Sequence, residues 1–166
     1  MESRNVFLAD AAATQALGRE LAEQWLTAAA AAQGTGATPA ILLLEGDLGA
    51  GKTCLVQGIA EGLGIPEAIT SPTFALAHHY GETWGRRSGH ALVHLDLYRL
   101  ELPAAADELF AQEEEEALAL GALLAVEWPC RLSFRPERAW RIKLSLAWSG
   151  DPASGRLALV DQPGLP

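Results

Sequence analysis

The sequence has 166 residues, of which 49% are hydrophobic, and its formal net charge is −9. This length and apolar content favour one folded domain over residues 1–166 and exclude a disordered chain. The negative charge argues against direct, tight binding to RNA or DNA, because phosphate contacts require a basic surface. No apolar run reaches the roughly 18 residues of a membrane span, and the first residues lack a signal peptide's apolar core. We therefore expect a cytoplasmic protein without membrane contact.

The cysteines, Cys54 and Cys130, lack the spacing of a metal site, which suits a reducing compartment without disulfides. Cys54 follows the start of an expected helix, where the helix dipole can lower a thiol pKa. We nevertheless rank packing of a small side chain above a redox role for it.

At the start of the chain, residues 4–8 are a candidate strand and Asp10 a candidate N-cap. The helix that should follow has apolar side chains every four residues, at Leu17, Leu21 and Trp25. Glycines and a proline in residues 33–39 end it, as expected of a connection.

Residues 46–53, GDLGAGKT, fit the phosphate-loop pattern G-x-x-x-x-G-K-[ST] at every fixed position. The apolar run 41–44 precedes them as a buried strand, and residues 54–63 follow with helical spacing. The glycines let backbone N–H groups turn inward, and the helix dipole favours anions at the same point. We therefore expect a nucleotide held by Asp47, Gly49, Ala50, Gly51, Lys52 and Thr53, with the Thr53 hydroxyl as a Mg²⁺ ligand.

Residues 69–74, ITSPTF, lie where nucleotide enzymes often place a segment that senses the γ-phosphate. Pro72 keeps this segment extended, so that Ser71 and Thr73 can face the same pocket. Residues 75–80 are expected as a strand, followed by a polar hairpin at 81–89. Its tip carries Trp84, Arg86 and Arg87, which fit a solvated loop better than a partner contact.

Two expected strands end in acids. Residues 90–99 place His94, Asp96 and Tyr98 at alternating positions, and residues 122–129 read as an apolar strand that ends at Glu127 and Trp128. Asp96 and Glu127 are therefore candidates to hold Mg²⁺ or the attacking water, and which of them contacts the metal directly is left open. His94 and Tyr98 are expected to be half-buried strand residues, and Trp128 to form a wall of the site.

A helix is expected from residue 104, with the glutamates at 113–116 on a solvated face. Residues 139–148 and 156–160 predict a closing antiparallel pair. Together these elements predict an α/β, P-loop NTPase-like, three-layer fold with a mixed, mostly parallel sheet and antiparallel strands at its C-terminal end.

The phosphate loop, TSPTF at 70–74, HLDLYR at 94–99 and EWP at 127–129 occur in the order found in TsaE proteins, and the chain resembles this family over nearly its full length. The family is the small bacterial ATPase of tRNA threonylcarbamoyladenosine biosynthesis, which works with TsaB and TsaD. The resemblance implies Mg²⁺ at Thr53 and Glu127, Asp96 near the γ-phosphate, and Thr14 and Trp128 beside the nucleotide. It further implies that Lys52, Asp96 and Glu127 serve ATP hydrolysis, and that tRNA is reached only through the partners.

Three other classes of protein also use a phosphate loop. A GTPase needs an N-K-x-D segment, and Asn5 is the only asparagine of the chain. A small-molecule P-loop kinase shares the loop and an acid, and its closing arginines would have to come from Arg86, Arg87 or residues 135–141. A nucleotide-gated binding module with slow hydrolysis is hardly separated from a weak ATPase by sequence.

Overall fold

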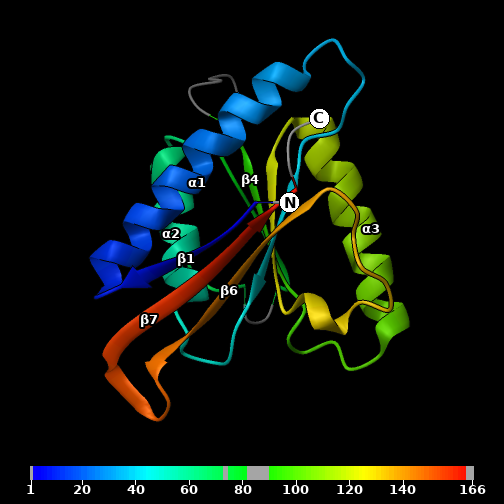
Figure 1. Cartoon of the computed structure of the whole chain (residues 1–166). Helices are drawn as coiled ribbons and strands as arrows, with labels where there is room; N and C mark the ends of the chain where they lie inside the picture. Colours follow the sequence, from blue (N-terminus) through cyan, green and yellow to red (C-terminus); the bar gives the residue numbers. More distant parts are fainter. Residues whose placement is uncertain (1, 73–74, 82–89, 164–166) are drawn as a thin grey trace.

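The computed structural model describes residues 2–72, 75–81 and 90–163. Its helices are α1 (Ala11–Ala32), α2 (Lys52–Gly62), α3 (Pro103–Leu120) and the short 3-10 helix η1 (Pro129–Arg131). Its strands are β1 (Glu2–Leu8), β2 (Ile41–Glu45), β3 (Ala77–Tyr80), β4 (Leu92–Asp96), β5 (Leu123–Glu127), β6 (Ala139–Trp148) and β7 (Asp151–Gln162). The strands form one sheet, with α1 and α2 on one face and α3 on the other (Figure 1). The predicted three-layer α/β fold is confirmed.

The sheet has the order β1-β7-β6-β2-β5-β4-β3. Its centre is parallel, since β2 pairs in parallel with both β6 and β5, and β5 pairs in parallel with β4. Antiparallel strands flank this centre, with β3 beside β4 on one side and β7 and β1 on the other. The carboxyl ends of β2, β5 and β4 consequently meet at one edge, which is where open α/β sheets bind ligands.

The apolar run that precedes the phosphate loop is buried because β2 is covered on both faces. Leu42 and Leu44 pack into the core beneath α1 and α2, and Leu43 packs into the core beneath α3. The predicted apolar stripe of α1 lies in the first of these cores. Trp25, the last of that stripe, also donates its indole N–H to the carbonyl of Ala40 at 2.8 Å, which anchors α1 beside the start of β2.

Local signals set the helix starts. Asp10 accepts a hydrogen bond from the Ala13 amide at 2.8 Å, which confirms it as the N-cap of α1. Pro103 is the first residue of α3, a position where its missing N–H has no helical partner. At the other end of α3, Gly121 adopts φ 62°, the left-handed conformation that commonly ends a helix.

Helices α1 and α2 pack backbone to backbone. A Cβ atom on Gly58 of α2 would overlap the backbone of Gln15, and one on Gly18 of α1 would overlap the carbonyl of Leu55. The side chains of Arg19 and Glu61 add an ion pair of 2.6 Å between the two helices. The helix that starts in the phosphate loop is therefore fixed directly on α1.

Several predicted boundaries were wrong. The strand expected from residue 90 begins only at Leu92, although it ends at Asp96 as predicted, because Asp96 accepts from the Tyr98 amide at 2.9 Å and the chain turns there. The strand expected over 75–80 begins only at Ala77, since Leu76 has φ 64°. Conversely, β7 is longer than the expected 156–160 because it pairs with strands on both sides. The hairpin tip that carries Trp84, Arg86 and Arg87 lies outside the described residues.

The acidic run at 113–116 was predicted to face solvent throughout, which is wrong for Glu113. This residue is 6% exposed, and one of its carboxylate oxygens lies 2.6 Å from Nε2 of His79 on β3. Glu113 lies three residues after the buried Phe110 and therefore on the same face of α3, which is turned toward the sheet. The imidazole of His79 compensates for the burial of its carboxylate. In the part of the chain described by the structure, none of the helices is long and apolar enough to cross a bilayer.

Candidate functional site

The phosphate loop connects the end of β2 to the start of α2 at the carboxyl edge of the sheet. All three glycines of the loop have positive φ angles, which other residues rarely adopt. Gly46 has φ 146°, and a Cβ there would lie 2.6 Å from the carbonyl oxygen of Leu144; Gly51 has φ 108° immediately before α2. The loop thereby turns within a few residues onto the amino end of α2, where free backbone N–H groups and the helix dipole favour an anion.

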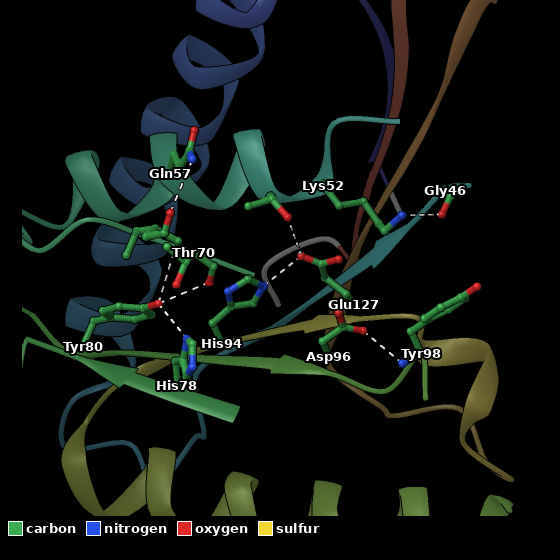
Figure 2. Close-up of polar contacts among 12 residues, drawn as sticks. Gly46, Lys52, Gln57, Thr70, His78, Tyr80, His94, Asp96, Tyr98 and Glu127 are labelled. Atoms are coloured by element: carbon green, nitrogen blue, oxygen red, sulfur yellow. Dashed lines mark hydrogen bonds and ion pairs between the residues drawn. The ribbon is translucent and has the colours of Figure 1, made fainter. Parts of the chain in front are cut away.

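Lys52, the first residue of α2, is folded back over the loop (Figure 2). Its ammonium donates to the carbonyls of Gly46 and Asp47 at 2.6 and 2.9 Å, and it lies 4.6 Å from the centre of the Trp128 ring. Burial lowers the pKa of Lys52, and the negative charges of Glu127 and Asp96 oppose this effect. The side chain is thus held at the loop by neutral carbonyls and an aromatic face.

The two predicted acids lie at the ends of neighbouring parallel strands. Asp96 ends β4 and Glu127 ends β5, and the two residues are partners in the strand register. Burial raises the pKa of the Asp96 carboxyl; the hydrogen bond from the Tyr98 amide opposes this rise, and the charge of Glu127 adds to it. Two carboxylates at the same edge of the sheet repel each other, which favours a cation between or beside them.

Glu127 connects the sheet to the phosphate loop. Its side chain is buried, and Oε1 accepts from the Thr53 hydroxyl at 3.5 Å and lies 2.8 Å from Nε2 of His94. A hydroxyl and a carboxylate are oxygen donors of the kind that Mg²⁺ prefers. No cluster of three or more acidic, histidine or cysteine side chains suited to a metal occurs among residues 2–72, 75–81 and 90–163. This small donor set fits Mg²⁺, which commonly takes one or two protein ligands together with phosphate and water.

A cavity of about 230 Å³ gathers most of the predicted residues. It is lined by Leu48, Gly49, Gly51, Lys52, Thr53, Cys54, Ser71, Asp96, Tyr98, Glu127 and Trp128. Asp47 and Ala50 belong to the loop without lining this cavity, and the Ala50 amide donates to the Asp47 carbonyl at 3.0 Å. Thr73 lies outside the described residues. A larger cavity of about 710 Å³ lies against α3 and the amino end of β2, away from the phosphate loop.

Thr14 lies on the far side of the loop. It is buried in α1, where its hydroxyl donates to the Asp10 carbonyl at 3.3 Å. It lines a neighbouring cavity of about 350 Å³ together with Gly51, Cys54 and Arg156. The two cavities share Gly51 and Cys54, so they lie on either side of the start of α2.

Cys54 is part of this packing. Burial raises the pKa of its thiol, and the negative charge of Glu61 adds to the rise. Its Sγ lies 3.5 Å from the carbonyl of Ala11, to which it donates. The surroundings therefore favour a protonated, unreactive thiol, in line with the expected packing role.

Sequence reasoning missed Arg156. From β7, its guanidinium donates to the carbonyls of Ala50 and Gly49, each at 3.1 Å, and so braces the phosphate loop from the side. Nothing near residue 156 in the sequence signals this role. It follows from the pairing of β7 with β6, which brings a distant strand to the loop.

His94 and Tyr98 were expected to be half-buried strand residues. His94 is fully buried and contacts Glu127, whereas Tyr98 is 37% exposed, follows the end of β4 and lies 4.8 Å from the Trp128 ring, centre to centre. Trp128 forms a wall of the cavity, as predicted. It has φ 57°, a left-handed backbone that is costly for a bulky residue and is typical of functional sites.

A separate set of hydrogen bonds holds the segment that leads to Ser71 (Figure 2). The Tyr80 hydroxyl lies 3.3 Å from the Thr70 carbonyl, 3.4 Å from the Thr70 amide and 2.9 Å from Nδ1 of His78. Gln57 of α2 donates to the Ile69 carbonyl at 3.4 Å. Helix α2 and strand β3 thus jointly anchor this segment before it reaches the cavity.

The model of the family described as "Threonylcarbamoyl adenosine biosynthesis protein TsaE" matches residues 8–151. The chain belongs to the TsaE family. A protein of Synechocystis sp. named "tRNA threonylcarbamoyladenosine biosynthesis protein TsaE" is 42% identical over 139 residues, which are 82% of this chain and 76% of the relative. A Nostoc sp. protein of the same name is 41% identical over 146 residues, 87% of this chain and 80% of the relative.

Among solved structures, Bacillus subtilis YdiB is similar with a TM-score of 0.64 and 27% sequence identity. The match covers 98% of this chain and 87% of YdiB. The likeness therefore includes the strands on both sides of the parallel centre, and the TsaE motifs lie within a fold shared over nearly the whole chain.

Proposed function

We propose that this protein binds and hydrolyses ATP with Mg²⁺ at the phosphate loop. The observation that carries the proposal is the pair Asp96 and Glu127, which end adjacent strands in register beside Thr53. A phosphate loop alone only binds phosphate. Acids at the neighbouring strand ends add the means to hold a metal and a water molecule, which hydrolysis requires.

Each residue then has a role that follows from its position. The loop amides and the start of α2 bind the phosphates, and Lys52 exchanges the Gly46 and Asp47 carbonyls for phosphate oxygens. Thr53 and Glu127 would hold Mg²⁺, which would supply positive charge to neutralise the phosphates. Asp96 orients the attacking water, because it lines the same cavity from the next strand.

We further propose that ATP turnover serves formation of the threonylcarbamoyl group on adenosine of tRNA, in concert with TsaB and TsaD. Membership of the TsaE family and the names of the Synechocystis and Nostoc relatives support this assignment. The net charge of −9 supports contact with tRNA through the partners rather than through this chain.

The test measures ATP turnover and modified adenosine in the same tubes, with the protein alone, with a TsaB–TsaD pair, and with the pair and tRNA. Low turnover alone that rises with the pair, together with repeated rounds of modification, is the expected result. Turnover that ignores the pair and leaves modification unchanged would contradict the assignment and favour a small-molecule kinase. In that case, small-molecule phosphate acceptors are screened next.

The site itself is tested by Asp96→Ala and Glu127→Ala, each of which should lose hydrolysis while remaining folded. Glu115→Ala is the matched control, because it removes an exposed carboxylate on α3. Circular dichroism verifies folding of all three variants. Normal turnover in both site variants would show that hydrolysis occurs elsewhere.

A further inference from the structure

His94 is the fully buried imidazole next to the two acids, and the proposed function gives it no task. It lies on β4 with 0% exposure. In the strand register His94 pairs with Ala125 of β5, two residues before Glu127. Because side chains two residues apart on a strand share a face, His94 and Glu127 lie on the same side of the sheet. Figure 2 shows the imidazole directed at the carboxylate.

The contact between His94 and Glu127 is a short hydrogen bond in which the imidazole is the donor. Nε2 of His94 lies 2.8 Å from Oε1 of Glu127, and an ionised carboxylate only accepts hydrogen bonds. Nε2 must therefore carry a hydrogen and donate it. Nδ1 is buried and has no hydrogen-bond partner within the described part of the chain. A second hydrogen on Nδ1 would be unpaired, so the arrangement favours the Nε2–H tautomer.

This hydrogen bond acts on the carboxylate that also contacts the phosphate loop. Oε1 of Glu127 accepts from Thr53 at 3.5 Å as well as from His94. The Nε2–H of His94 limits rotation of the Glu127 carboxyl group and so sets the direction of both carboxylate oxygens. Partners that orient a ligating side chain commonly change metal affinity by about 10- to 100-fold when they are removed.

We propose that His94 is a positioning residue for the divalent cation. Its Nε2–H holds the Glu127 carboxylate in the orientation in which it binds Mg²⁺ together with Thr53. The inference rests on the proposed function, since it gives Glu127 the metal. It assigns His94 no contact with nucleotide or metal and no exchange of protons during turnover.

The experiment separates metal binding from nucleotide binding. ADP affinity is measured by calorimetry in EDTA and then across a Mg²⁺ titration, for the wild-type protein, His94→Leu and His94→Gln. Leucine removes the donor, whereas the Gln side-chain amide can reach approximately where Nε2 lies. Val93→Ala, on the same strand but packed beneath α3, is the control for loss of stability alone.

We expect the Mg²⁺ concentration for half-maximal enhancement of ADP binding to rise about tenfold or more in His94→Leu. It should stay close to the wild-type value in His94→Gln and Val93→Ala. ADP affinity in EDTA should be similar in all four proteins. An unchanged Mg²⁺ requirement in folded His94→Leu would overturn the inference, and so would an equal loss of ADP affinity with and without Mg²⁺.

A spectroscopic measurement tests the orientation without nucleotide. Long-range proton–nitrogen NMR of the apo protein should show His94 with a protonated Nε2 and a bare Nδ1, and the signal should shift in Glu127→Gln. The opposite tautomer would overturn the inference. Wild-type protein that binds ADP without any Mg²⁺ effect would instead refute the metal site of the proposed function, which is a different outcome from a failure of His94 alone.

Discussion

Lys52 and Trp128 meet across the phosphate loop, with the ammonium 4.6 Å from the centre of the indole ring. The same ammonium donates to two loop carbonyls, Gly46 and Asp47. The Lys52 ammonium is therefore bound by uncharged groups, although it lies next to a site suited to phosphate. A nucleotide phosphate would offer it a stronger, charge-assisted hydrogen bond.

Lys52→Ala should weaken ATP binding by roughly 10- to 100-fold, because hydrogen bonds to charged groups contribute about 1.5–3 kcal/mol. Nucleotide binding should also change the fluorescence of Trp128 as Lys52 leaves its ring, and the change should be absent in Trp128→Phe. Lys143→Ala, which removes the other lysine and an exposed one, is the control and should bind normally. Unchanged ATP affinity in Lys52→Ala would contradict the loop assignment.

Asp96→Asn should make the apo protein more stable at pH 7 while abolishing hydrolysis. Burial raises the Asp96 pKa above 3.8, so the folded state prefers the protonated carboxyl. The stabilisation of the folded wild-type protein by protonated Asp96 is complete below pH 3.8. It is lost as the pH rises through the raised pKa of Asp96. The melting temperature of Asp96→Asn at pH 7 should therefore be higher than that of the wild-type protein.

The pH profile of that difference checks the sign. The advantage of Asp96→Asn should be constant near neutral pH and shrink on acidification toward pH 3.8, where wild-type Asp96 is protonated too. Glu115→Gln, an exposed acid on α3, should show no such profile. An advantage that grew on acidification would show that the folded state favours ionised Asp96.

Glu113→Ala should lower the free energy of unfolding by about 1–3 kcal/mol, because it removes the hydrogen bond to His79 and leaves a cavity at a buried position. Urea titration followed by circular dichroism measures the loss. The exposed neighbour in the same acidic run gives the comparison, since Glu115→Ala should stay within about 0.5 kcal/mol of wild type. Equal effects would mean that the contact between β3 and α3 is unimportant.

Gly58→Ala should destabilise the protein, although alanine favours helices over glycine by about 1 kcal/mol. The new methyl group would overlap the backbone of Gln15 and force α1 away from α2. Overpacking of this kind costs about 1–3 kcal/mol. Thermal unfolding decides the sign, and a raised melting temperature would show that the two helices separate without loss.

The sequence predicted those parts of the fold that depend on local signals. The apolar run before the loop, the N-cap at Asp10 and the helix expected from residue 104 depend on signals within a few residues, and the structure has each of them within one residue of the expected place. The sequence also placed Asp96 and Glu127 at the ends of two strands, where the structure has them. Their positions next to each other follow from the parallel order of β4 and β5.

Contacts between segments far apart in the chain could not be predicted in this way. Glu113 looked solvated because its neighbours are acidic, and only the sheet shows that His79 lies opposite it. His94 looked like an ordinary strand residue, because its contact with Glu127 joins residues that lie 33 positions apart in the chain. The bracing of the phosphate loop by Arg156 depends on β6 lying between β2 and β7, an order that no local pattern encodes.

The pairing of β1 with β7 has a consequence for how the chain is made. Residues 2–8 are synthesised long before their strand partners, residues 156–162. The strand before the phosphate loop, β2, also cannot pair until later, since its neighbours β5 and β6 begin only at Leu123 and Ala139. Long-range pairing of this kind makes folding slow. The pocket beside the phosphate loop therefore forms only after β6 has been synthesised, so a ribosome-bound fragment that stops before β6 should contain the complete loop motif without this pocket.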